Sequence, residues 1–159
     1  WKKPLQYLTE DYTLLTLVQP GNSVGVHNVG TDASRYGAWA RKLPEGGSMS
    51  VVMHPTFVKA TKGCQLSLRV IYLDEGDNQW TISHGNKKYT VKNTNTGQWK
   101  EMVWKVEGTE PLNGLEANKL VEQGMIAGKN KKQIAALIPD ITITALKGNP
   151  IFHMVEVFR

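Results

Sequence analysis

The sequence lacks several features that would narrow its function at once. It has a single cysteine, Cys64, among 159 residues, so an internal disulfide is excluded, and we expect a small buried or half-buried side chain rather than a reactive thiol. No apolar run reaches the roughly 18 residues that cross a bilayer, so no membrane partner is expected. The start, WKKPLQYLTEDYTLL, has neither an initiator methionine nor the apolar core of a signal peptide. We therefore expect residues 1–159 to form a single domain excised from a larger multidomain protein, or a processed product.

Local signatures of catalysis are also missing. The sequence contains no nucleophile elbow, phosphate-binding loop or dinucleotide fingerprint. The four histidines, His27, His54, His84 and His153, form no pair at metal-ligand spacing. A catalytic triad assembled from distant strands would leave no local motif, so that alternative stays open. The simplest interpretation is a domain that is not itself an enzyme.

The positive charge has two interpretations. The formal net charge is +5, and the lysines fall in short groups within residues 1–4, 85–88 and 128–132. Such groups could attract a polyanion, either a nucleic acid or an acidic polysaccharide. No basic helix, zinc-finger spacing or aromatic RNA-binding motif accompanies them. Solvated loop lysines are therefore the better interpretation, and no nucleic-acid partner is expected.

Alternation of apolar and polar residues dominates the chain and predicts many short strands separated by turn-rich segments. The pattern favours an all-β fold, an antiparallel jelly-roll β-sandwich, with a closed barrel as the alternative. The predicted strands span residues 12–18, 23–29, 35–42, 48–54, 65–74, 79–85, 87–92, 99–107, 140–146 and 151–158. Gly85 and Asn86 predict a tight hairpin corner.

One segment departs from this alternation. Residues 111–140 show helical spacing in two runs, with Asn130 able to cap the second run and Pro139 able to end it. We expect a short helical insertion near residues 113–138, packed on the rim of the sandwich.

The stretch SLRVIYLDEGDNQWTISHG places Asp74, Glu75 and Asp77 together at one turn. A glycosidase needs two carboxyl groups facing each other across a bond, roughly 5–10 Å apart. Three acids in one four-residue turn do not supply that geometry, and charged residues around a glycine are common at an exposed hairpin tip. A structural calcium ion is conceivable here, but the spacing of a calcium-binding loop is absent. We expect no cofactor, and the metal content stays unknown.

The aromatic residues offer a clearer functional hypothesis. Sugar rings stack on flat aromatic side chains while polar neighbours take their hydroxyl groups, although the same rings often fill sandwich cores. Trp99 and Trp104 should point to opposite faces of one strand. Alternation likewise places Arg35, Trp39 and Arg41 on one side of a strand, and Trp80 and His84 on one face of the next hairpin. His153 lies among apolar residues, so the simplest interpretation is a hydrogen-bonded core histidine.

Four segments taken together resemble a known family. They are similar to the jelly-roll accessory domains of secreted bacterial glycoside hydrolases, which have the galactose-binding-like fold of carbohydrate-binding modules of the family-6 and family-35 kind. The specific parts are a YLD-G strand end, a later N-TG-W turn and a closing FHMVEV strand. The segments are SRYGAWARK (34–42), LSLRVIYLDEGDNQWTI (66–82), NTGQWKEMVWKVEG (95–108) and PDITITALKGNPIFHMVEV (139–157).

The resemblance implies a non-catalytic module that binds a polysaccharide or oligosaccharide, or that supports the catalytic domain of a parent enzyme. It implies an extracellular, cell-surface or periplasmic location. Calcium is frequent in the related modules. The alternative is a purely structural or protein-interaction domain with every tryptophan in the core. The residues predicted to contact carbohydrate are Tyr36, Trp39, Trp80, His84, Arg35 and Arg41.

Overall fold

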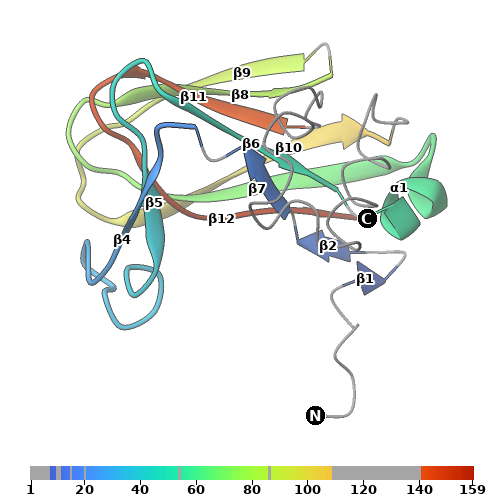
Figure 1. Ribbon diagram of the computed structural model, residues 1–159, viewed down its shortest axis with the longest axis horizontal. Coiled ribbons are helices and arrows are strands. Elements are labelled where there is room, and N and C mark those ends of the chain that lie inside the picture. The colour runs from blue at the N-terminus through green and yellow to red at the C-terminus, as the bar shows by residue number, and fades with distance from the viewer. Residues whose placement is uncertain are drawn as a thin grey trace.

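The computed structural model shows a sandwich of two antiparallel β-sheets (Figure 1), which confirms the predicted fold class. The structure describes residues 8–9, 12–14, 16–19, 21–53, 55–85, 87–108 and 141–159. The elements in these ranges are β1 (Leu8–Thr9), β2 (Tyr12–Leu14), β3 (Thr16–Gln19), β4 (Val24–Val26), β5 (Ala40–Lys42), β6 (Ser48–Val52), α1 (Pro55–Thr61), β7 (Gln65–Leu73), β8 (Gln79–His84), β9 (Lys87–Lys92), β10 (Trp99–Glu107), β11 (Ile141–Lys147) and β12 (Ile151–Phe158).

The connectivity is that of a jelly roll. In the first sheet, β12 pairs with β2 and β5 along one edge and with β7 along the other, β10 lies beyond β7, and β4 pairs with β5. The second sheet has the order β3-β6-β11-β8-β9. Consecutive described strands lie in different sheets at most steps along the chain, and the exceptions are the pairs β1–β2, β4–β5 and β8–β9. Residues distant in sequence are thereby brought to the same end of the sandwich.

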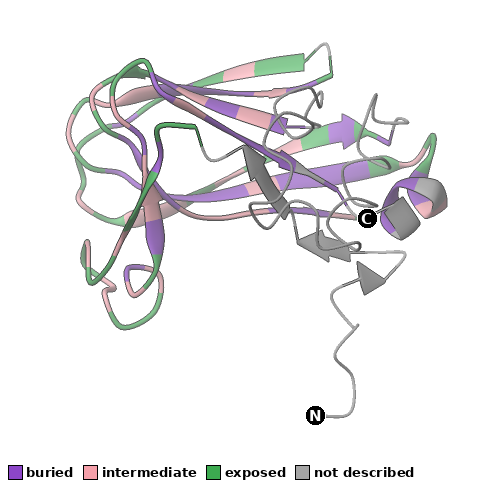
Figure 2. Ribbon diagram, in the orientation of Figure 1, coloured by how far each residue is buried: buried purple, intermediate pink, exposed green. Residues whose placement is uncertain are grey.

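Period-two alternation explains how the strands build the core. Along β7, Leu66, Leu68, Val70 and Tyr72 point between the sheets, and all are at most 5% exposed. The inward residues of β8, β11 and β12 meet them, so the buried surface in Figure 2 runs through the middle of both sheets. Burial of this apolar surface is the main stabilising contribution to such a fold.

The predicted β8–β9 hairpin is confirmed. His84 pairs with Lys87, which leaves a two-residue turn between the strands. Gly85 has a φ of 57°, in the left-handed region that tight hairpin corners require.

One predicted strand is largely absent, and one helix was not predicted. Residues 31–38 form turns rather than the start of a strand over 35–42, and only Ala40–Lys42 join the sheet as β5. The amide of Gly37 donates to the Asp32 carbonyl (2.9 Å), and the amide of Val29 donates to the Gly37 carbonyl (3.1 Å), so this backbone bonds within the connection. The second error is the missed helix α1, whose first-position proline and following glycine turn are a recognisable signal.

The helical insertion predicted near residues 113–138 lies outside the described residues. Among the residues that the structure describes, no helix is long and apolar enough to cross a membrane.

Candidate functional site

The acidic turn of the opening stretch is organised around a buried carboxylate. Asp74, directly after β7, is 0% exposed. Its two oxygens accept hydrogen bonds from the amides and hydroxyl groups of Thr94 and Thr96, at 2.6–3.1 Å. The ammonium of Lys100 lies 2.9 Å from Oδ2. Burial raises the pKa of Asp74, but the hydrogen bonds from Thr96, Lys100 and Thr94 outweigh it and hold the pKa well below its usual range.

Asn93 completes the same connection. Its Nδ2 donates to the carbonyls of Leu73 (3.2 Å) and Glu75 (3.0 Å), while its Oδ1 accepts from Trp80 Nε1 (3.3 Å). Asp74 and Asn93 therefore fasten the turn after β7 to the loop before β10. The YLD-G and N-TG-W motifs are parts of one structural contact.

The other two acids of the turn are at the surface. Asp77 forms an exposed ion pair with Lys147 (2.6 Å), and the hydrogen bond and charge of Lys147 lower the pKa of Asp77. Glu75 is exposed. Within the described ranges, no three His, Cys, Asp or Glu side chains are grouped to hold a metal ion. Because the Asp74 oxygens already accept protein donors, the residues of this turn do not fit a calcium site.

The structure corrects the prediction for Trp80 and His84. They do share a face of β8, as alternation predicted, but that face points into the core, and the side chains are 0% and 6% exposed. The Trp80 ring is packed edge-on against Tyr72, Trp104 and Phe152 at centroid distances of 4.9–6.4 Å. Burial lowers the pKa of His84, because it disfavours the charged form of the imidazole. Neither ring can stack on a sugar in this fold.

A second group of rings lies on the outer face of the first sheet, away from the core between the sheets. We call it the surface aromatic cluster. The T-shaped pair of His27 and Trp39 has a centroid distance of 4.4 Å. The centroid of the Tyr36 ring lies 5.3 Å from that of the His153 ring and 6.1 Å from that of the Trp99 ring. Its members are His27, Tyr36, Trp39, Trp99 and His153. The β4–β5 connection, which projects at the lower left of Figure 1, supplies the first three.

Trp39 is the most exposed large apolar side chain that the structure describes, at 72%. Its backbone is nevertheless held, because His153 Nδ1 lies 2.8 Å from the Trp39 carbonyl oxygen. A carbonyl can only accept, so this contact places the proton on Nδ1 of His153. His153 is half-buried and points outward, which corrects its interpretation as a core histidine.

The base of the cluster is apolar and continuous with the sheet. Half-buried Trp99, at the start of β10, packs on Ala40, Leu73 and Ile151. Trp104 belongs instead to the main core, so the prediction that Trp99 and Trp104 face opposite sides is confirmed. The connection is further attached to the loop before β10 by the Thr31 hydroxyl, which donates to the Gly97 carbonyl (3.2 Å).

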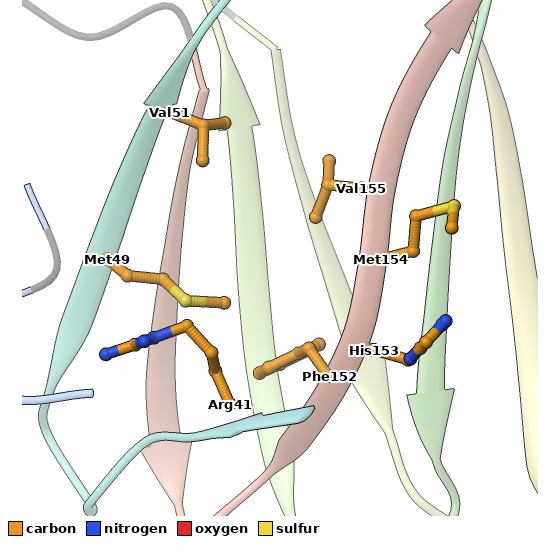
Figure 3. Close-up of a pocket in the computed structure, with 7 residues that line it drawn as sticks. All are labelled: Arg41, Met49, Val51, Phe152, His153, Met154 and Val155. Atoms are coloured by element: carbon orange, nitrogen blue, oxygen red, sulfur yellow. The ribbon is translucent and has the colours of Figure 1, made fainter. Parts of the chain in front are cut away.

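The two predicted arginines are separated. Arg35 is exposed, and its guanidinium lies 4.5 Å from the centroid of the Tyr36 ring, within the surface aromatic cluster. Arg41 instead donates to the hydroxyl and carbonyl oxygens of Ser23 (2.9 and 3.0 Å). In Figure 3 its side chain extends toward Met49 of the other sheet, whereas His153 points to the far side of β12.

Arg41 thus belongs to a different feature, a pocket of about 190 Å³ between the sheets. Met49, Val51, Phe152 and Val155 make most of its lining apolar (Figure 3). Arg41 is therefore separated from Arg35 and Trp39. Strand alternation predicted all three on one side, but residues 31–38 form turns, where that alternation does not hold.

The structure brings three of the predicted residues, Tyr36, Trp39 and Arg35, to one surface, and the sequence did not predict His27, Trp99 and His153 as their neighbours. These three residues come from three separate segments. The pairing of β4 with β5, β5 with β12, β12 with β7 and β7 with β10 brings those segments together. The one available signal was the predicted opposite orientation of Trp99 and Trp104.

Solved structures similar to the chain include carbohydrate-binding modules. CBM6cm-2 of Cellvibrio mixtus lichenase 5A, in complex with cellotriose, is 11% identical, and the match covers 92% of this chain and 98% of that one with a TM-score of 0.48. CBM35 of Cellvibrio japonicus Abf62 is 14% identical, with coverages of 91% and 93% and a TM-score of 0.47.

A peptidoglycan O-acetylesterase structure is also similar, at 13% identity and a TM-score of 0.47. The match covers 92% of this chain but only 30% of the esterase chain. No family model matches the sequence, and the search of curated proteins finds no relative. The similarities concern the arrangement of strands and assign no ligand to this chain.

Proposed function

We propose that the protein is a non-catalytic carbohydrate-binding module of a polysaccharide-degrading enzyme, and that it binds glycan at the surface aromatic cluster. The observation that carries this proposal is the 72% exposure of Trp39 on a backbone fixed by His153. An exposed indole in a rigid setting is unfavourable in water, and a sugar ring stacked on it would cover apolar surface without ordering a flexible loop.

The neighbours of Trp39 supply polar groups for the hydroxyl groups of a sugar. The Arg35 guanidinium has its donors beside the Tyr36 ring, and His27 is exposed against the Trp39 ring. In such a module, binding raises the effective concentration of an attached catalytic domain at the polymer. An extracellular, cell-surface or periplasmic location, and a catalytic domain as covalent partner, belong to this proposal.

The test is affinity electrophoresis and titration calorimetry of the protein against a panel of neutral polysaccharides, with Trp39→Ala as the main variant. Leu146→Ala is the matched control, since Leu146 is 48% exposed on β11 of the other sheet. We expect Trp39→Ala to abolish measurable retention and Leu146→Ala to leave it unchanged. Equal retention of both variants and the parent protein would contradict the proposed site.

A second candidate function is a structural or protein-interaction domain that packs against a catalytic domain. The exposed Trp39 contradicts the expectation that this alternative leaves every tryptophan in the core. It is consistent with a protein-interaction domain, because indole rings also anchor protein interfaces. This function predicts no retention on any polysaccharide. It also predicts that a larger chain carrying this domain is destabilised by Trp39→Ala, although the isolated domain is not.

A further inference from the structure

The rings of the surface aromatic cluster differ in whether they leave a face open to a ligand. Among its tyrosine and tryptophan rings, Trp39 alone is exposed, at 72%, whereas Tyr36 and Trp99 are half-buried. The number of open faces decides how many sugar residues can stack at the site, because each stacked sugar needs a flat apolar surface of its own. The contacts of Tyr36, Trp99 and His27 therefore bear on the part of a glycan that fits.

The Tyr36 ring is engaged by its neighbours within the protein. The Arg35 guanidinium lies over one face of the ring, 4.5 Å from its centroid. The centroids of the His153 and Trp99 rings lie 5.3 and 6.1 Å from that of Tyr36. Rings whose centroids are about 4.5–7 Å apart are in direct contact, so no sugar ring fits between Tyr36 and either neighbour. Tyr36 therefore supports the cluster and does not offer a second stacking platform.

Trp99 forms the floor of the cluster. Its ring packs on Ala40, Leu73 and Ile151, and its Nε1 is buried. The backbone of Gly30 lies against the edge of this indole, since a Cβ at Gly30 would meet Nε1 at 2.9 Å. An indole that is packed from below and covered along its edge adds apolar surface to the site but leaves too little of itself free to hold a second sugar ring.

His27 ends the flat surface beside Trp39. The two ring centroids are 4.4 Å apart, and the ring planes are at 90° to each other. A ring at right angles either covers one face of the indole or stands at its edge, and in both arrangements it does not continue the plane of the indole. The exposed imidazole instead brings ring nitrogens, which donate and accept hydrogen bonds, close to whatever stacks on Trp39.

We infer that the site recognises one sugar residue, at a chain terminus or a branch tip, and not successive residues along an extended chain. This inference rests on the proposed glycan-binding function and names the part of the glycan that is bound. A terminal residue has a single glycosidic bond, so it can lie over Trp39 with its free hydroxyl groups toward Arg35 and His27 while the rest of the chain leads away into solvent. An internal residue continues in two directions, and its neighbours find no second platform among the rings of the cluster.

The experiment is calorimetric titration of the protein with oligosaccharides of increasing length, from the disaccharide to the hexasaccharide, prepared from the neutral polysaccharide that retains it most strongly. A second stacked sugar would strengthen binding by about two- to tenfold, the range of one aromatic stacking contact. We expect the affinity per chain to stay constant within about twofold instead, with one protein bound per chain. A larger rise with length, or several protein molecules bound along one longer linear chain, would overturn the inference.

A branched polysaccharide and its debranched form separate the two sources of a terminal residue. Loss of binding on debranching assigns the site to branch tips, and unchanged binding assigns it to chain termini. Tyr36→Leu tests the role given to the neighbouring ring. Because the Tyr36 ring is already covered, we expect this variant to weaken disaccharide binding by at most about threefold, less than one full stacking contact can contribute, whereas Trp39→Ala abolishes it.

The outcomes separate this inference from the proposed function. Absence of retention on every polysaccharide contradicts the proposed function, and the inference with it. Retention that depends on Trp39, combined with an affinity that rises with chain length, leaves the proposed function in place and overturns the inference alone. Complete loss of binding in Tyr36→Leu, at an unchanged melting temperature, would make Tyr36 a second platform and would likewise overturn it.

Discussion

The two groups of aromatic side chains in this protein have similar ring geometry but differ in exposure to solvent. Around Trp80, centroid distances are 4.9–6.4 Å, and in the surface aromatic cluster they are 4.4–6.3 Å. Trp80 is 0% exposed and Trp39 is 72% exposed. The core group stands on strands, whereas much of the surface group stands on the β4–β5 connection. The type and spacing of the rings therefore do not show which group can meet a ligand. Exposure and the supporting backbone do.

The largest effect should come from the core group. Trp80→Ala removes the largest fully buried side chain of the described core, and we expect a loss of about 3–5 kcal/mol in the free energy of unfolding. Urea denaturation followed by circular dichroism measures it. Trp80→Phe, which keeps a ring but loses the hydrogen bond to Asn93, should cost clearly less, and equal losses would contradict a role in packing.

Asp74 links the core to the surface group, and its substitution should be the next most costly. Asp74→Asn keeps the shape of the side chain but removes its negative charge. That charge is neutralised by Lys100 and stabilised by hydrogen bonds from the threonines. We expect a loss of about 2–3 kcal/mol in the free energy of unfolding. Asp77→Asn is the matched control at the exposed end of the same turn and should change stability little. A large effect of Asp77→Asn would contradict this division of roles.

The same carboxylate predicts how stability depends on pH. The pKa of Asp74 is lower in the folded protein than in the unfolded chain, where it is about 3.9. Above that value the stabilisation is fully present, and it is lost progressively as the pH falls toward the folded-state pKa. Thermal melts from pH 5 down to pH 2 should show a fall in melting temperature that is shallower in Asp74→Asn. Parallel curves for the two proteins would contradict this cause.

His153 should have a smaller effect on stability than on binding. His153→Phe keeps a ring next to Tyr36 but removes the Nδ1 contact to the Trp39 carbonyl. The expected cost is about 1 kcal/mol in the free energy of unfolding. Retention on glycan should weaken because the backbone of Trp39 is less fixed. Unchanged retention in the folded variant would show that Trp39 does not need this support.

The smallest effect on stability is expected at Trp39 itself. Because its side chain is largely in water, Trp39→Ala should change the free energy of unfolding by less than about 0.5 kcal/mol. The contrast with Trp80→Ala is the most direct check on which tryptophan is structural. A loss comparable to that of Trp80→Ala would place Trp39 in the core and remove the basis of the proposed site.

Alternation predicted the strands of the sandwich well, and it failed where the backbone leaves the sheet. The predicted strands 87–92, 99–107 and 151–158 match β9, β10 and β12. In these strands a buried face forces period two. Residues 35–38 lie in a turn closed by Gly37, so strand parity grouped Arg41 with Trp39 wrongly. Trp80 and His84 were grouped correctly, but parity alone does not say which face of a strand is covered by the other sheet.

The closure of the β4–β5 connection on its own backbone has a consequence for how such a domain could change over time. The bond between Val29 and Gly37 seals the segment at its base, and Gly37 has no space for a side chain because a Cβ would collide with the Val29 carbonyl. The residues between these two points can then be replaced, lengthened or exchanged while the register of β4 with β5 is kept. The sandwich and residues 30–36 are therefore separable units, whereas Trp39 lies outside this closed segment, next to the start of β5.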